Sequence, residues 1–369
     1  MTEWIECTLD KLGEIVGGAT PSTKCEDYYG GSIPWITPKD LSSFKGRYIT
    51  SGERNITEKG LASCSAQMMP KDAVLFTSRA PIGYVAIASQ SVCTNQGFKS
   101  IVVNEKADPL FVYYLLKYNK DAIEAMGSGT TFKEVSGKTM RAVKVRIPLD
   151  VSYQKRIAAV LDSLDTKIEN NERINDNLQQ QAQAIYSSMF IDNPDPAWSH
   201  GHLSDLITVK YGKDHKKLAD GIYPVYGSGG IMRYVERPLY NKESVLIPRK
   251  GTLNNVMYVN QPFWSVDTMF YTEMKLPNVA KFVYHFVKAK DLASMNAGSA
   301  VPSMTTDILN AMEVVIPSAS ALEEFESLVA PMYEAMEAND VQSKALSQIR
   351  DTLLPKLMSG EIDDSDVQL

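Results

Sequence analysis

A short run in the first half of the chain has residue types that bind phosphate. Ser136-Gly137-Lys138-Thr139 follows a glycine-rich stretch and resembles the end of a loop whose backbone N–H groups and lysine hold a nucleotide. The complete pattern also requires a glycine five residues before Gly137, and Phe132 occupies that position. The sequence therefore does not predict a nucleotide-binding loop.

Two further reactions leave recognisable patterns, and neither pattern is complete. A DNA methyltransferase needs a glycine-rich cofactor loop and an (Asn/Asp)-Pro-Pro-aromatic motif, whereas Asn193-Pro194-Asp195-Pro196 departs from that motif at its last two positions. A nuclease needs clustered carboxylates with a lysine. Asp307 and Glu313 do not qualify as a shared acidic site, because lysines occupy the corresponding positions of an internal repeat. The sequence predicts a protein that is not an enzyme.

Metal and membrane sites are not indicated either. The four cysteines lie in the first quarter of the 369 residues without a CxxC pair, and the four histidines lack metal-ligand spacing. No apolar run approaches the roughly 20 residues that span a bilayer. The N-terminal stretch is acidic and amphipathic, unlike a signal peptide. We expect a cytoplasmic protein with reduced thiols, no metal site and no membrane association.

The charge is distributed unevenly along the chain. The net charge of −6 divides into +2 for residues 1–150, −3 for 151–198, +3 for 199–317 and −8 for 318–369. Two mildly basic segments therefore alternate with two acidic ones.

The alternation reflects an internal repeat. Trp4, Leu9, Leu12 and Gly18 recur 194 residues later as Trp198, Leu203, Leu206 and Gly212. Ser136, Met140, Val145, Ile147 and Pro148 recur 169 residues later as Thr305, Leu309, Val314, Ile316 and Pro317. In this second copy Lys138 becomes Asp307, so the lysine of the apparent phosphate loop has no counterpart. The repeated segment predicts a loop, a short helix and an edge strand. Residues 72–83 also resemble 243–254, which suggests that Arg79 and Arg249 match.

A long helical pattern follows each copy. Its apolar positions are spaced alternately by four and three residues, the spacing of a coiled-coil seam. The first seam contains Ile157, Leu161, Leu164, Ile168, Asn171, Leu178 and Ile185. The second contains Phe325, Val329, Met332, Met336, Asn339, Leu346, Leu353 and Leu357.

One such stripe alone is also typical of an amphipathic helix that covers a core. Two stripes 168 residues apart, each after a repeated segment, favour two helices packed on each other with pseudo-twofold symmetry. Asn171 and Asn339 match, and a buried asparagine fixes register at some cost in stability.

We therefore predict an α+β protein with two similar domains, each followed by a long helix, and with the helices paired as an antiparallel coiled coil. Short β-rich runs with Gly and Pro punctuation fill both globular segments. The predicted boundaries are 1–150 and 193–317 for the domains, 151–192 and 318–360 for the helices, and 361–369 for an acidic tail.

At this level the chain resembles the DNA-specificity subunits of type I restriction–modification systems. "GGATPST", "IPWITPKDL" and "QIRDTLLPKLMSGEI" are similar to segments of that family, as is the order of domain, helix, domain, helix. The resemblance implies a non-catalytic subunit whose target-recognition domains each read half of a gapped double-stranded DNA site. The helices would set the gap and dock two methyltransferase subunits, alongside the motor and nuclease restriction subunits. S-adenosylmethionine, ATP and magnesium would belong to those partners, with no cofactor in this chain.

Basic residues in loops are the best candidates for DNA contacts. The first domain offers Lys39, Arg79, Lys133 and Lys138. The second offers Lys213, Lys216, Lys217, Arg249 and Lys250. Each is also an ordinary solvated charge in another interpretation. A methyltransferase or nuclease component with an unrecognised catalytic site, or a coiled-coil scaffold for protein or RNA, stays an alternative.

Overall fold

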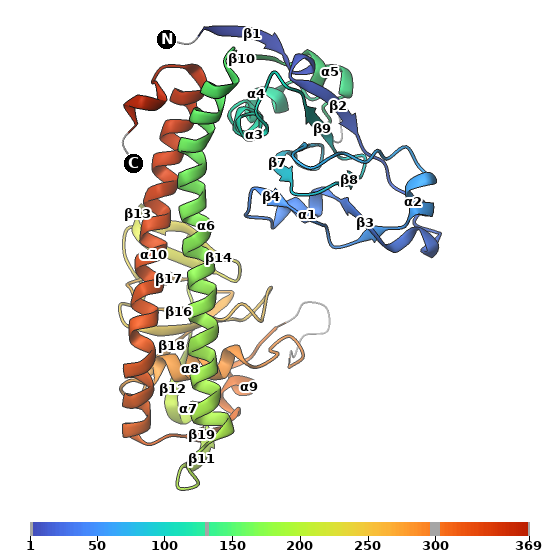
Figure 1. The fold of residues 1–369 in the computed structure, drawn as a ribbon. Coiled ribbons are helices and arrows are strands. Elements are labelled where there is room, and N and C mark those ends of the chain that lie inside the picture. Colours follow the sequence, from blue (N-terminus) through green and yellow to red (C-terminus); the bar gives the residue numbers. More distant parts are fainter. Residues whose placement is uncertain (1–2, 130–132, 296–302, 368–369) are drawn as a thin grey trace. The chain divides into compact units, whose positions relative to one another are not determined.

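The computed structural model describes residues 3–129, 133–295 and 303–367. The chain forms two compact units: unit 1 comprises Met1–Arg173 and Asn339–Leu369, and unit 2 comprises Ile174–Ala338. Each unit thus contains one globular segment of the repeat together with a part of both long helices (Figure 1). The predicted domain boundaries stay predictions, because compactness groups the helices with the globular segments.

Unit 1 contains a five-stranded sheet of order β2-β9-β6-β7-β4, a three-stranded sheet of order β5-β3-β8, and the pair β1-β10. Its strands are β1 (Trp4–Thr8), β2 (Gly13–Gly17), β3 (Tyr29–Ile36), β4 (Tyr48–Ile49), β5 (Asn55–Ile56), β6 (Val74–Ser78), β7 (Ile82–Ala88), β8 (Cys93–Thr94), β9 (Lys99–Val103) and β10 (Lys144–Pro148). Its shorter helices are α1 (Pro38–Ser42), α2 (Glu58–Ala62), α3 (Pro109–Tyr118), α4 (Lys120–Ala125) and α5 (Gly137–Ala142).

Unit 2 contains a four-stranded sheet of order β12-β18-β15-β16, a three-stranded sheet of order β14-β13-β17, and the pair β11-β19. Its strands are β11 (Ser199–His202), β12 (Ile207–Tyr211), β13 (Asp220–Gly227), β14 (Gly230–Val235), β15 (Ser244–Pro248), β16 (Met257–Val259), β17 (Trp264–Ser265), β18 (Met269–Met274) and β19 (Glu313–Ile316). Its shorter helices are α7 (Leu203–Leu206), α8 (Ala280–Lys288) and α9 (Thr306–Asn310).

The two units repeat the same topology in the same register. In the pair β1-β10, Ile5 lies opposite Ile147, and in β11-β19 Ser199 lies opposite Ile316, which are the positions 194 and 169 residues further on. The parallel pairs β3-β8 and β13-β17 also correspond. This confirms the predicted duplication of an α+β domain.

Strand register corrects one match within the repeat. The backbone N–H of Ser78 donates to the Gly97 carbonyl at 2.7 Å, and the N–H of Arg249 donates to the Thr268 carbonyl at 2.9 Å. Both bonds end the central strand of their sheet, so Arg249 corresponds to Ser78. The structural counterpart of Arg79 is therefore Lys250, and the predicted match between Arg79 and Arg249 is wrong by one residue. Backbone hydrogen bonds, which fix the register, are not visible in side-chain similarity.

The apparent phosphate-binding residues begin a helix. Ser136 Oγ accepts a hydrogen bond from the Thr139 backbone N–H at 3.0 Å and caps α5. Thr305 Oγ1 accepts from the Ile308 N–H at 3.3 Å and caps α9 in the same way. The serine and threonine are thus required as helix caps, which confirms the prediction of a loop, short helix and edge strand.

The long helices are α6 (Val151–Ser187), which continues as a π-helical turn over Ser188–Asp192, and α10 (Ala319–Ser359). They lie side by side with opposite directions (Figure 1). In unit 1, Asn171 Nδ2 donates to Gln342 Oε1 at 2.9 Å and to Ser343 Oγ at 3.1 Å. In unit 2, Asn175 Nδ2 donates to the Met336 carbonyl at 3.2 Å. These side chains connect the helices through two polar rungs.

All the predicted seam positions are at least partly buried. Ile157, Leu161, Leu164, Asn171, Phe325, Val329 and Leu357 are buried, whereas Ile168, Leu178, Ile185, Met332, Met336, Asn339, Leu346 and Leu353 are half-buried. Ile157, Leu161 and Leu357 belong to the core of unit 1 together with residues of α3 and the sheet, and Phe325 and Val329 belong to the core of unit 2. Both interpretations of the stripe therefore hold, because the helices pack on each other and also complete the domain cores.

Corresponding positions of α3 and α8 attach each globular segment to the helices. In unit 1, Tyr114 donates its hydroxyl to Asp165 Oδ2 at 2.8 Å, and Arg350 Nη1 donates to Asp165 Oδ1 at 2.6 Å. In unit 2, the position of Tyr114 is taken by His285.

The imidazole of His285 is fully buried between α6 and α10. Its Nδ1 lies 2.8 Å from Gln183 Oε1, and its Nε2 lies 3.0 Å from the Tyr333 hydroxyl. Burial lowers the pKa of His285 to about 4, so the ring is neutral near pH 7. Nδ1–H therefore donates to the amide oxygen while Nε2 accepts from the tyrosine.

Candidate nucleic-acid interface

Three loops of unit 2 come together beside the turn of the β13-β14 hairpin. The carbonyl of Lys213, in the loop after β12, accepts a hydrogen bond from Trp264 Nε1 at 2.9 Å. Trp264 lies in β17, which pairs with β13 next to the turn. From the loop after β15, Asn255 Nδ2 donates to the Ser228 carbonyl in the turn itself at 2.8 Å. The loops at 212–218, 227–230 and 249–255 thus form one surface.

This surface carries an excess of positive charge. Lys213, Lys216, Lys217 and Lys250 are exposed, and none of them forms an ion pair with a described residue. Arg249 is half-buried, with its guanidinium 5.3 Å from the centre of the Tyr211 ring and Nη1 3.3 Å from the Asp267 carbonyl oxygen. The sequence-predicted candidates of the second domain therefore share one region.

Unit 1 builds the same loops from different residues. The carbonyl of Ala19 accepts from Trp35 Nε1 at 3.0 Å, as the Lys213 carbonyl does from Trp264. Where β13 ends in a hairpin turn, β3 ends at α1, which begins with a capping box between Thr37 and Asp40. Lys39, in the first turn of α1, is exposed and lies 2.6 Å from Glu53 Oε2.

The other candidates of the first domain lie near Glu134. Arg79 Nη1 lies 3.6 Å from Glu134 Oε2, and Lys99 Nζ lies 3.6 Å from Glu134 Oε1. Lys133 and Lys138 are exposed and form no ion pair with any residue in the described ranges. Two of the four candidates of unit 1 are thus neutralised by carboxylates, in contrast to those of unit 2.

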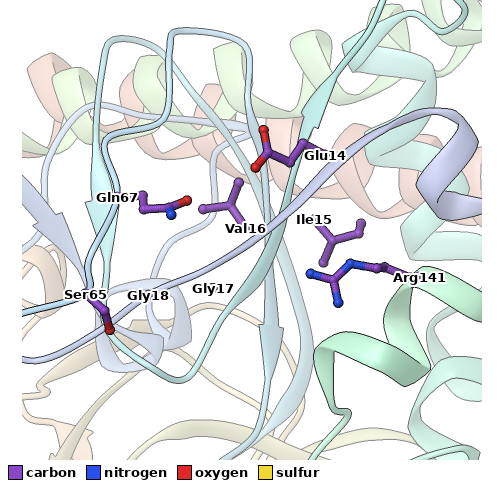
Figure 2. Close-up of a pocket in the computed structure, with 8 residues that line it drawn as sticks. All are labelled: Glu14, Ile15, Val16, Gly17, Gly18, Ser65, Gln67 and Arg141. Atoms are coloured by element: carbon purple, nitrogen blue, oxygen red, sulfur yellow. The ribbon is translucent and has the colours of Figure 1, made fainter.

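A hollow of about 300 Å³ lies along the edge strand β2 of unit 1 (Figure 2). Glu14 and Arg141 lie at it, together with Ser65, Gln67 and the backbone of Gly17 and Gly18. The counterpart of Gly17 is Tyr211, whose ring carries Arg249 in unit 2. Unit 1 therefore leaves open a position that unit 2 fills with an aromatic–arginine pair.

Sequence reasoning missed Tyr211 and the β13-β14 hairpin, and it missed Arg47 as a residue that holds unit 1 together. Tyr211 directly precedes Gly212, which belongs to the repeat, so the neighbouring position was the available signal. In the described part of the chain no group of His, Cys, Asp and Glu side chains has the arrangement of a metal site. Nor does any helix there have the length and apolarity needed to cross a membrane.

Comparison with known proteins bears on what these surfaces do. The family model described as "Type I restriction modification DNA specificity domain" matches residues 1–180 and 197–325. The chain belongs to this family. It is accordingly a specificity subunit, the non-catalytic member that recognises DNA target sites within a type I restriction–modification complex.

Individual relatives extend the match over almost the whole chain. The type I restriction enzyme MjaIX specificity subunit of Methanocaldococcus jannaschii is 32% identical over 98% of this chain and 94% of its own length. The EcoprrI specificity subunit of Escherichia coli is 23% identical over 90% of this chain and 89% of its own. The crystal structure of the type I S subunit from M. genitalium matches the fold with a TM-score of 0.63, at 19% identity, over 97% of this chain and 96% of that one.

Proposed function

We propose that this specificity subunit reads an asymmetric, gapped site in double-stranded DNA. Residues 1–150 and 193–317 would each contact one half-site as target-recognition domains. The helices at 151–192 and 318–360 would set the gap and bind two methyltransferase subunits, since acidic surfaces are unsuited to phosphates. Motor and nuclease restriction subunits complete the assembly in the cytoplasm, and S-adenosylmethionine, ATP and magnesium belong to the partners.

The observation that supports this proposal is a shared scaffold with different loop residues. Strand register matches Ala19 with Lys213 and Arg79 with Lys250, while Lys39 of α1 falls where unit 2 has the hairpin turn. Base readout depends on the side chains that reach the groove edges. Equivalent loops with different side chains therefore favour two half-sites of different sequence.

The loop lysines of unit 2 are expected to contact phosphates. Replacing Lys213, Lys216 and Lys217 together by alanine should weaken binding of the whole complex to its cognate duplex. Removing one lysine–phosphate pair should lower the magnitude of the slope of log K against log salt concentration by about 0.9, so the triple variant should lower it by up to about 3. The measurement is a titration of labelled duplex at several salt concentrations.

A matched control replaces Lys106, Lys120 and Lys144, which are not candidates for DNA contact, and should leave the slope unchanged. If the triple variant of the unit 2 loop had the same slope as the control, these lysines would not contact DNA phosphates.

A further inference from the structure

The β13-β14 hairpin of unit 2 exposes large apolar side chains to solvent. Ile231 is 42% exposed, Met232 is 61% exposed and Tyr234 is 43% exposed, all on β14, and Ile222 on β13 is 78% exposed. Single exposed apolar residues are ordinary, but several on one hairpin are typical of a binding surface. Ser32 takes the place of Ile222 in unit 1, so the shared fold does not require this apolar surface.

The backbone directs two of these side chains to the turn. Val225 lies opposite Arg233 and Tyr226 lies opposite Ile231, so Met232 is the extra residue of a β-bulge. A bulge re-aims a side chain and is frequent near functional sites. A Cβ at Gly227 would lie 2.5 Å from Met232 Sδ, so Gly227 provides the space that Met232 occupies.

The turn itself leaves room for close approach from outside. A Cβ built on Gly229 or Gly230 would meet no atom of the described chain within 4 Å. Gly230 has a φ of +112°, which favours glycine, but Gly229 is required neither by its φ nor by packing. Glycine at such a position permits another molecule to contact the backbone.

Positive charge surrounds this apolar turn. Ser228 adjoins Gly251, whose Cβ would lie 2.8 Å from Ser228 Oγ, and Lys250 precedes it. Lys213 adjoins the other side through Trp264 of β17. An apolar tip ringed by lysines without ion-pair partners among described residues fits a polyanion with apolar groups in its groove. The major groove of B-DNA has these properties: it admits a two-stranded ribbon and displays thymine methyl groups between phosphates.

We propose that Ile231 and Met232 are specificity-determining residues of unit 2, which contact thymine methyl groups in the major groove of one half-site. This inference rests on the proposed reading of a gapped DNA site. It adds that the hairpin turn reads bases through apolar contact, whereas the surrounding lysines position the duplex.

The test uses the complete complex with its methyltransferase partner and the double variant Ile231→Ala with Met232→Ala. Methylation rates are compared on the cognate duplex and on duplexes with single base-pair changes at each motif position. The expected result is that discrimination falls about tenfold at one or two A·T positions of a single half-site. Discrimination in the other half-site and the gap length should be unchanged. A second variant, Met232→Gln, keeps the side-chain length and should change discrimination at one of the same positions.

Ile222→Ser is the matched control, because it removes an exposed apolar side chain from the same hairpin away from the turn. It should leave every motif position unchanged. Unaltered discrimination in both turn variants would overturn the inference, and so would relaxation confined to G·C positions. Loss of co-purification with the methyltransferase, with the motif retained, would also overturn it, because the turn would then be a protein-docking surface. A wild-type complex without a gapped motif would instead contradict the proposed function itself.

Discussion

Replacing Arg47 by alanine is expected to destabilise unit 1 by about 3 kcal/mol, because it leaves buried carboxylates without their cation. The Arg47 side chain is 6% exposed, and it lies 3.2 Å from both Asp162 Oδ1 and Glu169 Oε2 of α6. Its Nη2 also donates to Thr166 Oγ1 at 2.9 Å. The loop that follows α1 is therefore held on the long helix by a single buried guanidinium.

The pKa values of its partners show what this arrangement costs. Burial raises the pKa of Asp162 and of Glu169, although the positive charge of Arg47 acts in the opposite direction. Without Arg47 both pKa values should rise further, and part of the loss should be relieved by proton uptake at low pH.

Hydrogen exchange measured separately for peptides of unit 1 and unit 2 would locate the effect of the Arg47 variant. Faster exchange should be confined to unit 1, around α1, β4 and the first part of α6. Lys45→Ala is the control: Lys45 lies on the same loop and 3.5 Å from Glu172, but its side chain is 77% exposed. That variant should change stability by no more than about 0.5 kcal/mol. Equal effects of the two variants would show that the buried cluster does not hold the loop.

A matched insertion in both long helices is expected to lengthen the gap without changing either half-site. The site for it lies after Arg173 in α6 and after Ala338 in α10, where unit 1 meets unit 2 along the chain. This position separates the rung made by Asn171 from the rung made by Asn175 and leaves the bonds of both rungs intact. A heptad in each helix preserves the seam and adds roughly 10 Å, about three base pairs of DNA.

The longer site should be methylated more slowly, because each added base pair also turns the duplex by about 34°. Mapping of methylated motifs in host DNA would report the gap and the half-sites together. A heptad in α6 alone is the control, since it slips one helix against the other and should abolish activity. If the paired insertion changed the half-sites but left the gap as it was, the helices would not be the ruler.

Periodicity and duplication carried most of the fold, because both are written in side-chain type. Leu9 and Leu203 are core residues of equivalent 3-10 or α-helical turns, and their spacing is visible without coordinates. The helix expected over 109–126 is broken at Asn119 into α3 and α4, since backbone geometry decides such breaks. The match between Arg79 and Arg249 was wrong by one residue for the same reason.

The interface was less accessible from the sequence than the fold. Basic loop residues can be recognised by type, but not whether a carboxylate lies beside them. Glu53 pairs with Lys39 and Glu134 pairs with Arg79 across 14 and 55 positions. The apolar turn of the hairpin was missed because Ile231 and Met232 read as core residues until the bulge places them in solvent.

The claim that two similar but distinct domains read one gapped site is tested most directly by mapping methylated positions. The chain would be expressed with its methyltransferase partner in a host without other modification systems, and the modified bases of the host genome would be sequenced. We expect one motif with two different half-sites separated by unspecified base pairs. A continuous motif, or a perfectly palindromic one, would contradict the account.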